Sequence, residues 1–140
     1  MLHFTPYLHF NGNTEEVINY YKSVLGGEIT IMGRYKDIPG GEKMPPELQD
    51  KIIHASLVIN ERLTIMATDA LEQMGRQLVE GNNFHICMHT ESESETNKLF
   101  EKLSKDGSIE MPLNKTFWGA YFGMCRDKYG IQWMFNYYDR

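Results

Sequence analysis

Imidazole, hydroxyl and thiol groups recur at alternate positions in two segments of the 140-residue chain. They belong to His3, Thr5, Tyr7 and His9 in the first segment, and to His85, Cys87 and His89 in the second. Because successive side chains of a strand point to opposite faces, each set would line one face. Imidazoles that are neutral near pH 7 can act as general bases or bind a divalent metal, so both segments predict a polar part of a functional site.

The histidines also allow simpler interpretations. His9 and His89 can line a cavity or be structural residues with hydrogen-bonded rings. His54 lies on the less apolar face of a strand predicted over residues 52–60, and it is either a candidate base or an ordinary half-buried imidazole.

The two cysteines lack the spacing of a metal knuckle or a redox pair, and we expect buried, free thiols at Cys87 and Cys125. Cys87 near His85 could alternatively be an activated nucleophile, although residues two apart on a strand need not touch. The sequence contains no Gly-x-Ser-x-Gly elbow and no phosphate-binding glycine loop.

Aromatic and methionine side chains suggest an apolar pocket with few polar groups, as ligand sites commonly have. The candidates are Tyr7, Met66, Trp118, Phe122, Met124, Trp133 and Met134. The alternative for each of them is core packing between sheet and helix.

The elements that would carry these residues occur twice, because the chain repeats itself at a spacing of 80 residues, as from Phe4 to Phe84. Further identical pairs are His9/His89, Glu15/Glu95, Lys22/Lys102, Gly27/Gly107 and Ile29/Ile109. Each copy has the order strand, helix, strand, strand, strand, which predicts an α+β fold of two βαβββ modules, over about residues 1–70 and 83–140 of a single domain.

Hydrophobic periodicity and turn residues give approximate bounds. We expect strands at 3–10, 28–35, 52–60, 62–68, 84–90, 108–112, 118–126 and 131–137, and helices at 13–25, capped by Asn13, and at 92–105. The proline- and glycine-rich segment 36–50 is predicted to be a long loop without helix or strand, and 69–82 a poorly patterned connection.

Composition excludes several classes of protein. A net charge of −5 with scattered basic residues argues against nucleic acid as a partner. No stretch reaches the roughly 20 apolar residues that span a bilayer, and no secretory signal is evident, so we expect a cytoplasmic protein without membrane contact.

Three motifs, together with the element order and the repeat, resemble the PhnB-like branch of the glyoxalase/bleomycin-resistance/dioxygenase superfamily, also called vicinal oxygen chelate. The motifs are Pro6 to Gly12, Tyr20 to Gly27, and Phe117-Trp118-Gly119 through Asp127 to Met134. The resemblance implies that the two modules pair into a curved, cup-shaped mixed sheet, and that the protein is a homodimer. In this superfamily the cup either holds a divalent metal that binds vicinal substrate oxygens, or binds a drug without metal.

Transferred to this chain, the family's metal-ligand positions fall at about Thr5, Met66, His85 and Met134. Only His85 is a good ligand for a divalent transition metal, because hydroxyls and thioethers bind such ions weakly. We therefore expect no cofactor and a cup that binds a small, partly apolar molecule. The alternative is a metal-dependent lyase, isomerase or dioxygenase that uses His85 with other donors.

The residues expected to line the cup are Tyr7, His9, His54, Met66, His85, His89, Trp118, Phe122 and Met134. Relatives of this branch are sometimes described as ubiquinone-pathway methyltransferases. A nucleotide-type methyl donor would usually need a glycine-rich turn between strand and helix, which Asn11-Gly12-Asn13 does not provide.

Overall fold

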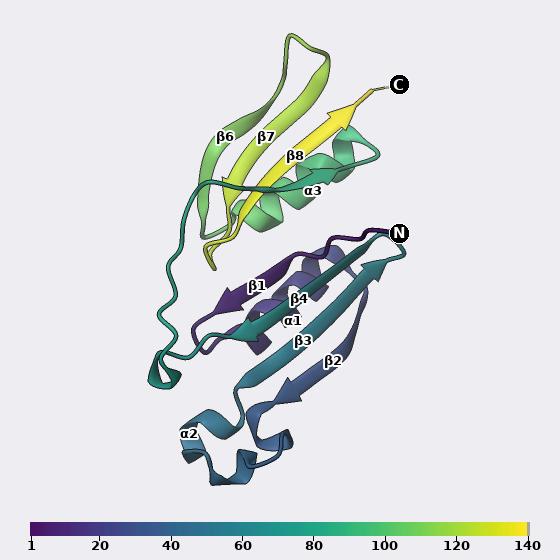
Figure 1. Cartoon of the computed structure of the whole chain (residues 1–140). Coiled ribbons are helices and arrows are strands. Elements are labelled where there is room, and N and C mark those ends of the chain that lie inside the picture. Colours follow the sequence, from purple (N-terminus) through teal and green to yellow (C-terminus); the bar gives the residue numbers. More distant parts are fainter. Residues whose placement is uncertain (140) are drawn as a thin grey trace. The chain divides into compact units, whose positions relative to one another are not determined.

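Each half of the chain folds into a four-stranded mixed sheet with one long helix (Figure 1). The computed structural model describes residues 1–139. These divide into two compact units, Met1–Val79 and a second that begins at Glu80, and the boundary lies inside the predicted connection. The two units correspond to the two predicted modules, while their union into one domain stays a prediction.

The first unit follows the predicted order, with an insertion between its second and third strands. Its main elements are β1 (Tyr7–Phe10), α1 (Thr14–Leu25), β2 (Glu28–Arg34), β3 (Ile52–Asn60) and β4 (Leu63–Asp69). The strand order is β1-β4-β3-β2, in which β1 runs parallel to β4 and the other neighbours are antiparallel.

The second unit repeats this topology. Its elements are β5 (Ile86–His89), α3 (Glu93–Ser104), β6 (Ser108–Lys115), β7 (Ala120–Arg126) and β8 (Gln132–Tyr138). The strand order β5-β8-β7-β6, with β5 parallel to β8, matches the first sheet strand for strand. The α+β prediction and the two βαβββ modules are confirmed.

In each unit the helix covers one face of its sheet. The stripe of α1 buries Val17, Ile18 and Tyr21 completely, and residues of β3 and β4 such as Leu57 and Ile65 are equally buried. In the second unit, Phe100 of α3 meets Phe135 of β8 edge to face, with ring centroids 5.2 Å apart. In these strands, every second side chain therefore packs against the helix, and the side chains between them lie on the opposite face of the sheet.

The buried carboxylate of Asp69 joins three segments of the first unit. It accepts hydrogen bonds from the backbone N–H of Gly12 at 3.1 Å, Thr14 at 3.0 Å and Ile52 at 2.8 Å. Asn13 occupies the N-cap position of α1, but its side chain makes no capping hydrogen bond. The predicted Asn13 cap is thus wrong in its chemistry, because a carboxylate from β4 provides the acceptor that a capping side chain would supply.

Gly27 and Gly107, an identical pair in the repeat, occupy equivalent positions in the two units. A Cβ atom at Gly27 would collide with the carbonyl oxygen of Val58, and one at Gly107 with that of Arg126. The repeat therefore preserves a close backbone approach that a side chain would block.

Segment 36–50 differs from its prediction. It contains 3₁₀ turns at Tyr35–Asp37 and Gly41–Lys43 and the short helix α2 (Pro46–Gln49). Pro46 lies at the start of α2, where its missing N–H costs no hydrogen bond. Tyr35, Leu48 and Leu71 form a small buried cluster beneath the segment, so it is packed as well as helical.

Several predicted strand bounds were also wrong. β1 begins at Tyr7, which leaves Thr5 before the strand, and β6 continues through Pro112 to Lys115. Trp118 lies in the turn before β7 instead of within it, because the Thr116 hydroxyl and N–H bond to Ala120 across that turn. Among residues 1–139, no helix is both long and apolar enough to cross a membrane.

Replacing Asp69 with alanine should lower the free energy of unfolding by about 3 kcal/mol, because three N–H groups lose an ionised acceptor. Urea titration followed by circular dichroism measures the change. Glu61→Ala in the exposed turn between β3 and β4 is the control, expected within about 0.5 kcal/mol of wild type. Equal stability of Asp69→Ala and wild type would contradict the joining role of this carboxylate.

Candidate functional site

We call the face of each sheet opposite its helix the open face, and strand register identifies its residues. In the first unit, Met66 pairs with Tyr7 of β1 and Ser56 of β3, while the buried Ala67 pairs with Leu8 and Ala55 on the helix side. The open face therefore includes four predicted cup residues: Tyr7, His9, His54 and Met66.

Three of these side chains are in direct contact. The Tyr7 hydroxyl and His54 Nδ1 are 2.9 Å apart, and their rings stack with centroids 5.6 Å apart. The Tyr7 and His9 rings also have centroids 5.6 Å apart. Burial raises the pKa of Tyr7, with a further contribution from Tyr35, so the phenol stays protonated and can donate. β1 and β3 are not neighbours in the sheet, so sequence spacing could not place Tyr7 on His54.

Arg76 extends this group and was missed by sequence reasoning. Its Nη2 lies 3.4 Å from His9 Nδ1, and its backbone N–H donates to the Leu71 carbonyl at 3.3 Å. Burial, and then the Arg76 charge, lower the pKa of His9, which makes its imidazole neutral at pH 7. Arg76 follows a 3₁₀ turn at Glu72–Met74 in the poorly patterned connection, where no periodicity indicates which way a side chain points.

The second open face carries mainly apolar and sulfur-containing side chains. Met134 pairs with Cys87 of β5 and Met124 of β7, and Asn136 pairs with His89 and Phe122. The predicted cup residues His89, Phe122 and Met134 thus share this face of the second sheet.

His85 lies immediately before β5 and contacts a carboxylate that sequence reasoning missed. Its Nε2 is 3.1 Å from Oε1 of Glu110 in β6, and the two side chains are 16% and 28% exposed. β5 and β6 are opposite edges of the sheet, so only the tertiary structure brings this pair together.

The two tryptophans occupy different environments. Trp118 is half exposed in the β6–β7 turn, and its ring meets Phe122 at 5.9 Å between centroids. Trp133 is 1% exposed and donates through Nε1 to the Asp127 carboxylate at 2.8 Å. The suggestion that Trp133 lines the pocket is wrong, because it shares the helix-facing side of β8 with Phe135.

Both thiols are free, but only one matches its prediction. Cys125 is buried, and burial with the nearby Asp127 and Glu110 raises its pKa to about 12. Cys87 is exposed on the second open face, contrary to the expected burial, because it alternates with the helix-facing residues of β5. Partial desolvation raises the pKa of Cys87, which argues against an activated thiolate there.

The donor set on these faces is poor for a metal. Of the four family positions, His85 alone provides a strong donor, with Glu110 as a second one beside it. In the part of the chain that the structure describes, no three His, Cys, Asp or Glu side chains form a group that could hold a metal ion.

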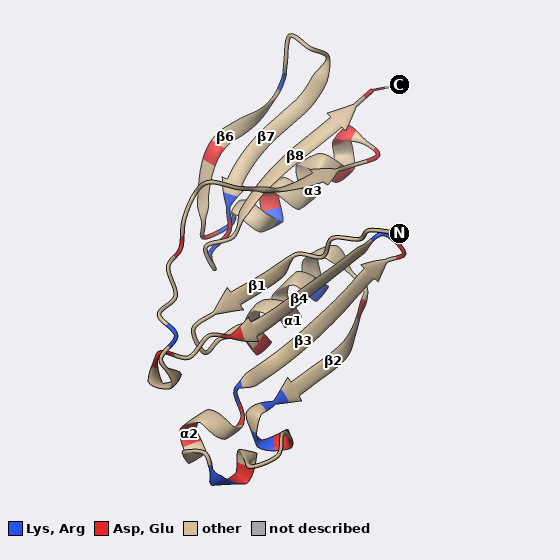
Figure 2. Cartoon of the chain, viewed as in Figure 1, with Lys and Arg blue, Asp and Glu red and all other residues tan. Residues whose placement is uncertain are grey.

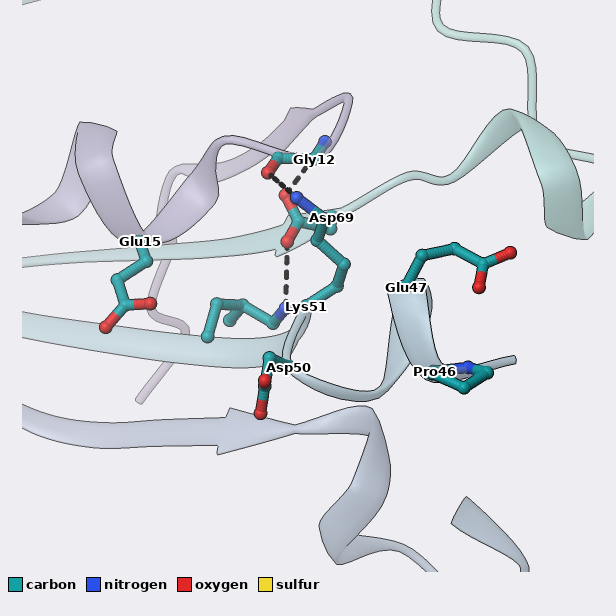
Figure 3. A pocket seen from close by; sticks show the side chains of 8 residues that line it. Gly12, Glu15, Pro46, Glu47, Asp50, Lys51 and Asp69 are labelled. Atoms are coloured by element: carbon teal, nitrogen blue, oxygen red, sulfur yellow. Dashed lines mark hydrogen bonds between the residues drawn. The ribbon is translucent and has the colours of Figure 1, made fainter. Parts of the chain in front are cut away.

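A pocket of about 330 Å³ lies at the start of α1 (Figure 3). Glu15, Glu47 and Asp50 line it, together with Lys51, whose Nζ donates to the Gly12 carbonyl at 2.8 Å. The N–H groups of Gly12 and Thr14 already donate to Asp69, so the helix terminus holds a carboxylate of the protein where a phosphate would otherwise bind.

Another pocket, on the second unit, has a volume of about 340 Å³ and includes a predicted cup residue. His89 lines it with Asn136 and Tyr138.

The βαβββ units define a class of protein. A glyoxylase/bleomycin resistance protein/dioxygenase domain from Frankia sp. EAN1pec superposes with a TM-score of 0.65 at 13% identity, covering 100% of this chain and 94% of that domain. At this identity the likeness shows the fold alone, which is the glyoxalase/bleomycin-resistance fold.

Sequence comparison gives the family. The profile of the family described as 3-demethylubiquinone-9 3-methyltransferase matches residues 2–135. Protein YjdN of Escherichia coli (strain K12) is 32% identical over an alignment of 140 positions, which covers 94% of this chain and 92% of YjdN. The chain belongs to this family, the PhnB-like branch of the glyoxalase/bleomycin-resistance/dioxygenase superfamily, as its motifs predicted.

Two solved structures agree with this assignment. Protein PA1353 from Pseudomonas aeruginosa is 36% identical with a TM-score of 0.86, and 100% of both chains is covered. A putative 3-demethylubiquinone-9 3-methyltransferase, PhnB protein, from Bacillus cereus is 29% identical with a TM-score of 0.77, covering 96% of this chain and 98% of that one.

We expect His9 to titrate below the range of an ordinary histidine, measured by NMR of the imidazole carbons across pH. Arg76→Gln should raise the pKa of His9 only in part, because burial is the larger cause of the shift. The pKa of His9 is lower in the folded state than in the unfolded state, so protonation favours unfolding. The free energy of unfolding should therefore decrease as the pH falls from the unfolded-state pKa of His9 to its folded-state pKa. Arg62→Gln is the control, and a normal or raised pKa for His9 would contradict the contact.

Proposed function

We propose that this protein binds a small, partly apolar molecule on an open face of its sheets, without a metal. The observation that carries the proposal is the open face of the first unit, where Tyr7 contacts both His9 and His54 beside Met66. A few oriented polar groups next to apolar surface are typical of small-molecule sites.

The side chains of the second open face support the same function. Met124, Met134 and Phe122 offer polarisable, adaptable surface, and the Trp118 ring, in the turn before β7, extends it. Such a surface binds by shape and dispersion, which suits a ligand with a flat or branched apolar body.

The family description names a methyltransferase, and we do not extend that activity to this chain. The amides of Gly12 and Thr14, at the turn between β1 and α1, donate to Asp69, which leaves this turn committed to the fold. The resemblance also implies a homodimer, and the sequence predicts a cytoplasmic location; both properties stay predictions.

A metal-dependent lyase, isomerase or dioxygenase is the second candidate, and the contact between His85 and Glu110 favours it. An imidazole and a carboxylate 3.1 Å apart are two ordinary donors for a divalent ion. The remaining family positions oppose it, because Thr5, Met66 and Met134 offer a hydroxyl and two thioethers.

Titration with N-phenyl-1-naphthylamine, an uncharged probe that fluoresces in apolar sites, should show saturable binding. Met66→Asp should weaken that binding at least about tenfold, because the probe would then have to desolvate a carboxylate on the open face. Val79→Asp adds the same charge at an exposed apolar residue outside the sheet and should leave binding unchanged. Wild-type affinity in Met66→Asp would contradict this placement of the site.

Metal content decides between the two candidates. Protein purified without chelator should contain transition metal well below one equivalent by elemental analysis, because the donor set is weak. A stoichiometric metal that is lost in both His85→Ala and Glu110→Ala, but retained in the control His3→Ala, would instead establish the metal-dependent alternative.

A further inference from the structure

Near Tyr7, His9 and His54, the residues that strand register places on the first open face carry no negative charge; the one carboxylate that register adds to the described part of this face is Glu28, at the start of β2, where it pairs with Val58. In Figure 2, β1, β3 and β4 are tan, the colour of uncharged residues, except for the red end of β4. The last residue of that strand is Asp69. That carboxylate belongs to the helix-facing side and is 2% exposed. Open-face neighbours such as Ser56, Met66 and Thr68 carry no charge. Among the described residues, these neighbours therefore offer the Arg76 cation no carboxylate.

Arg76 is held at the edge of this face by its backbone. Its N–H donates to the carbonyl of Leu71, and Leu71 is buried against Tyr35 and Leu48. The guanidinium has five N–H donors, of which one approaches His9 Nδ1 at 3.4 Å. The side chain is exposed, so other donors of the guanidinium are accessible to a ligand.

The two imidazoles add donors of their own. His9 accepts at Nδ1 from Arg76, so the neutral ring carries its hydrogen on Nε2. His54 Nδ1 is hydrogen-bonded to the Tyr7 hydroxyl. In either tautomer of His54, the Tyr7–His54 pair keeps one further hydrogen that can be donated to a ligand. The hydrogen is on His54 Nε2 when tyrosine donates, and on the Tyr7 hydroxyl when histidine donates.

These hydrogen-bond donors lie next to apolar surface, and no neighbouring carboxylate competes with a ligand for them. Such an arrangement suits a ligand that has one acidic group and an apolar body. We propose that the first open face binds the oxyanion of such a ligand, a carboxylate, sulfonate or phosphoryl group, through Arg76 with His9 and the Tyr7–His54 pair. The apolar body lies over Met66. Arginine suits this role because its planar fork binds oxyanions through two parallel hydrogen bonds. This inference rests on the proposed function and specifies the chemical class of the ligand.

Two probes with one skeleton test it: 8-anilinonaphthalene-1-sulfonate, which has a sulfonate, and N-phenyl-1-naphthylamine, which lacks it. The wild type should bind the sulfonate at least about tenfold more tightly at low salt, because the anion gains charge-assisted hydrogen bonds. Arg76→Gln should remove most of this preference without weakening the uncharged probe, and Arg76→Lys should retain part of it, since lysine keeps the charge but not the fork.

Arg62→Gln is the matched control, because it removes the same charge from the turn between β3 and β4. Arg62 is six residues before Thr68, the partner of His9, and so lies roughly 20 Å along the strand. The control should keep the full preference for the sulfonate.

The outcomes separate this inference from the function on which it rests. Saturable binding of both probes with equal affinity, or an equal loss in the Arg62 and Arg76 variants, would overturn the oxyanion site and leave small-molecule binding intact. A wild type that binds neither probe saturably would overturn both. Preference for the sulfonate that disappears only in Arg76→Gln supports the inference.

Discussion

The first unit depends on one buried carboxylate. Asp69 ends β4, yet it bonds to the turn after β1, to the first residue of α1 and to the first residue of β3. Its backbone carbonyl also accepts from the hydroxyl of Tyr35 at 3.1 Å, which ties the residue just before segment 36–50 to the sheet. A buried charge is costly unless its hydrogen bonds are made, so these segments must assemble together.

That assembly determines where chemistry can occur. With α1 on one face of the sheet, alternate residues of β1, β3 and β4 are left for the open face, and these include the tyrosine and the histidines. The second unit repeats the arrangement with different anchors. There, Asp127 accepts from the N–H groups of Tyr129 and Ile131 and from the Trp133 ring, which stabilises the turn between β7 and β8. Equivalent scaffolds thus present different chemistry, Tyr7 and His54 on one face and His85 with Glu110 on the other.

Alternation predicted which of these side chains share a face, but not which ones touch. Tyr7, His9 and His54 were chosen from period-two patterns and Met66 from the family's ligand positions, and register places all four on one face of their sheet. Arg76 and Glu110 could not be found in this way. Arg76 follows a turn without periodicity, and Glu110 meets its partner across the width of a sheet. Trp133 shows the opposite error, because an aromatic residue fits the core and a pocket equally well.

The sequence by itself determined the two modules, their helices and the family, because hydrophobic periodicity, turn glycines and an internal repeat are local properties of a chain. Gly27 and Gly107 show how directly such a signal encodes structure, since each meets a neighbouring carbonyl that leaves no room for a side chain. Only the tertiary structure decided the contacts of Tyr7 with His54, of His9 with Arg76 and of His85 with Glu110. These join residues from different elements, and their distances follow from strand order and backbone path, which no local pattern contains.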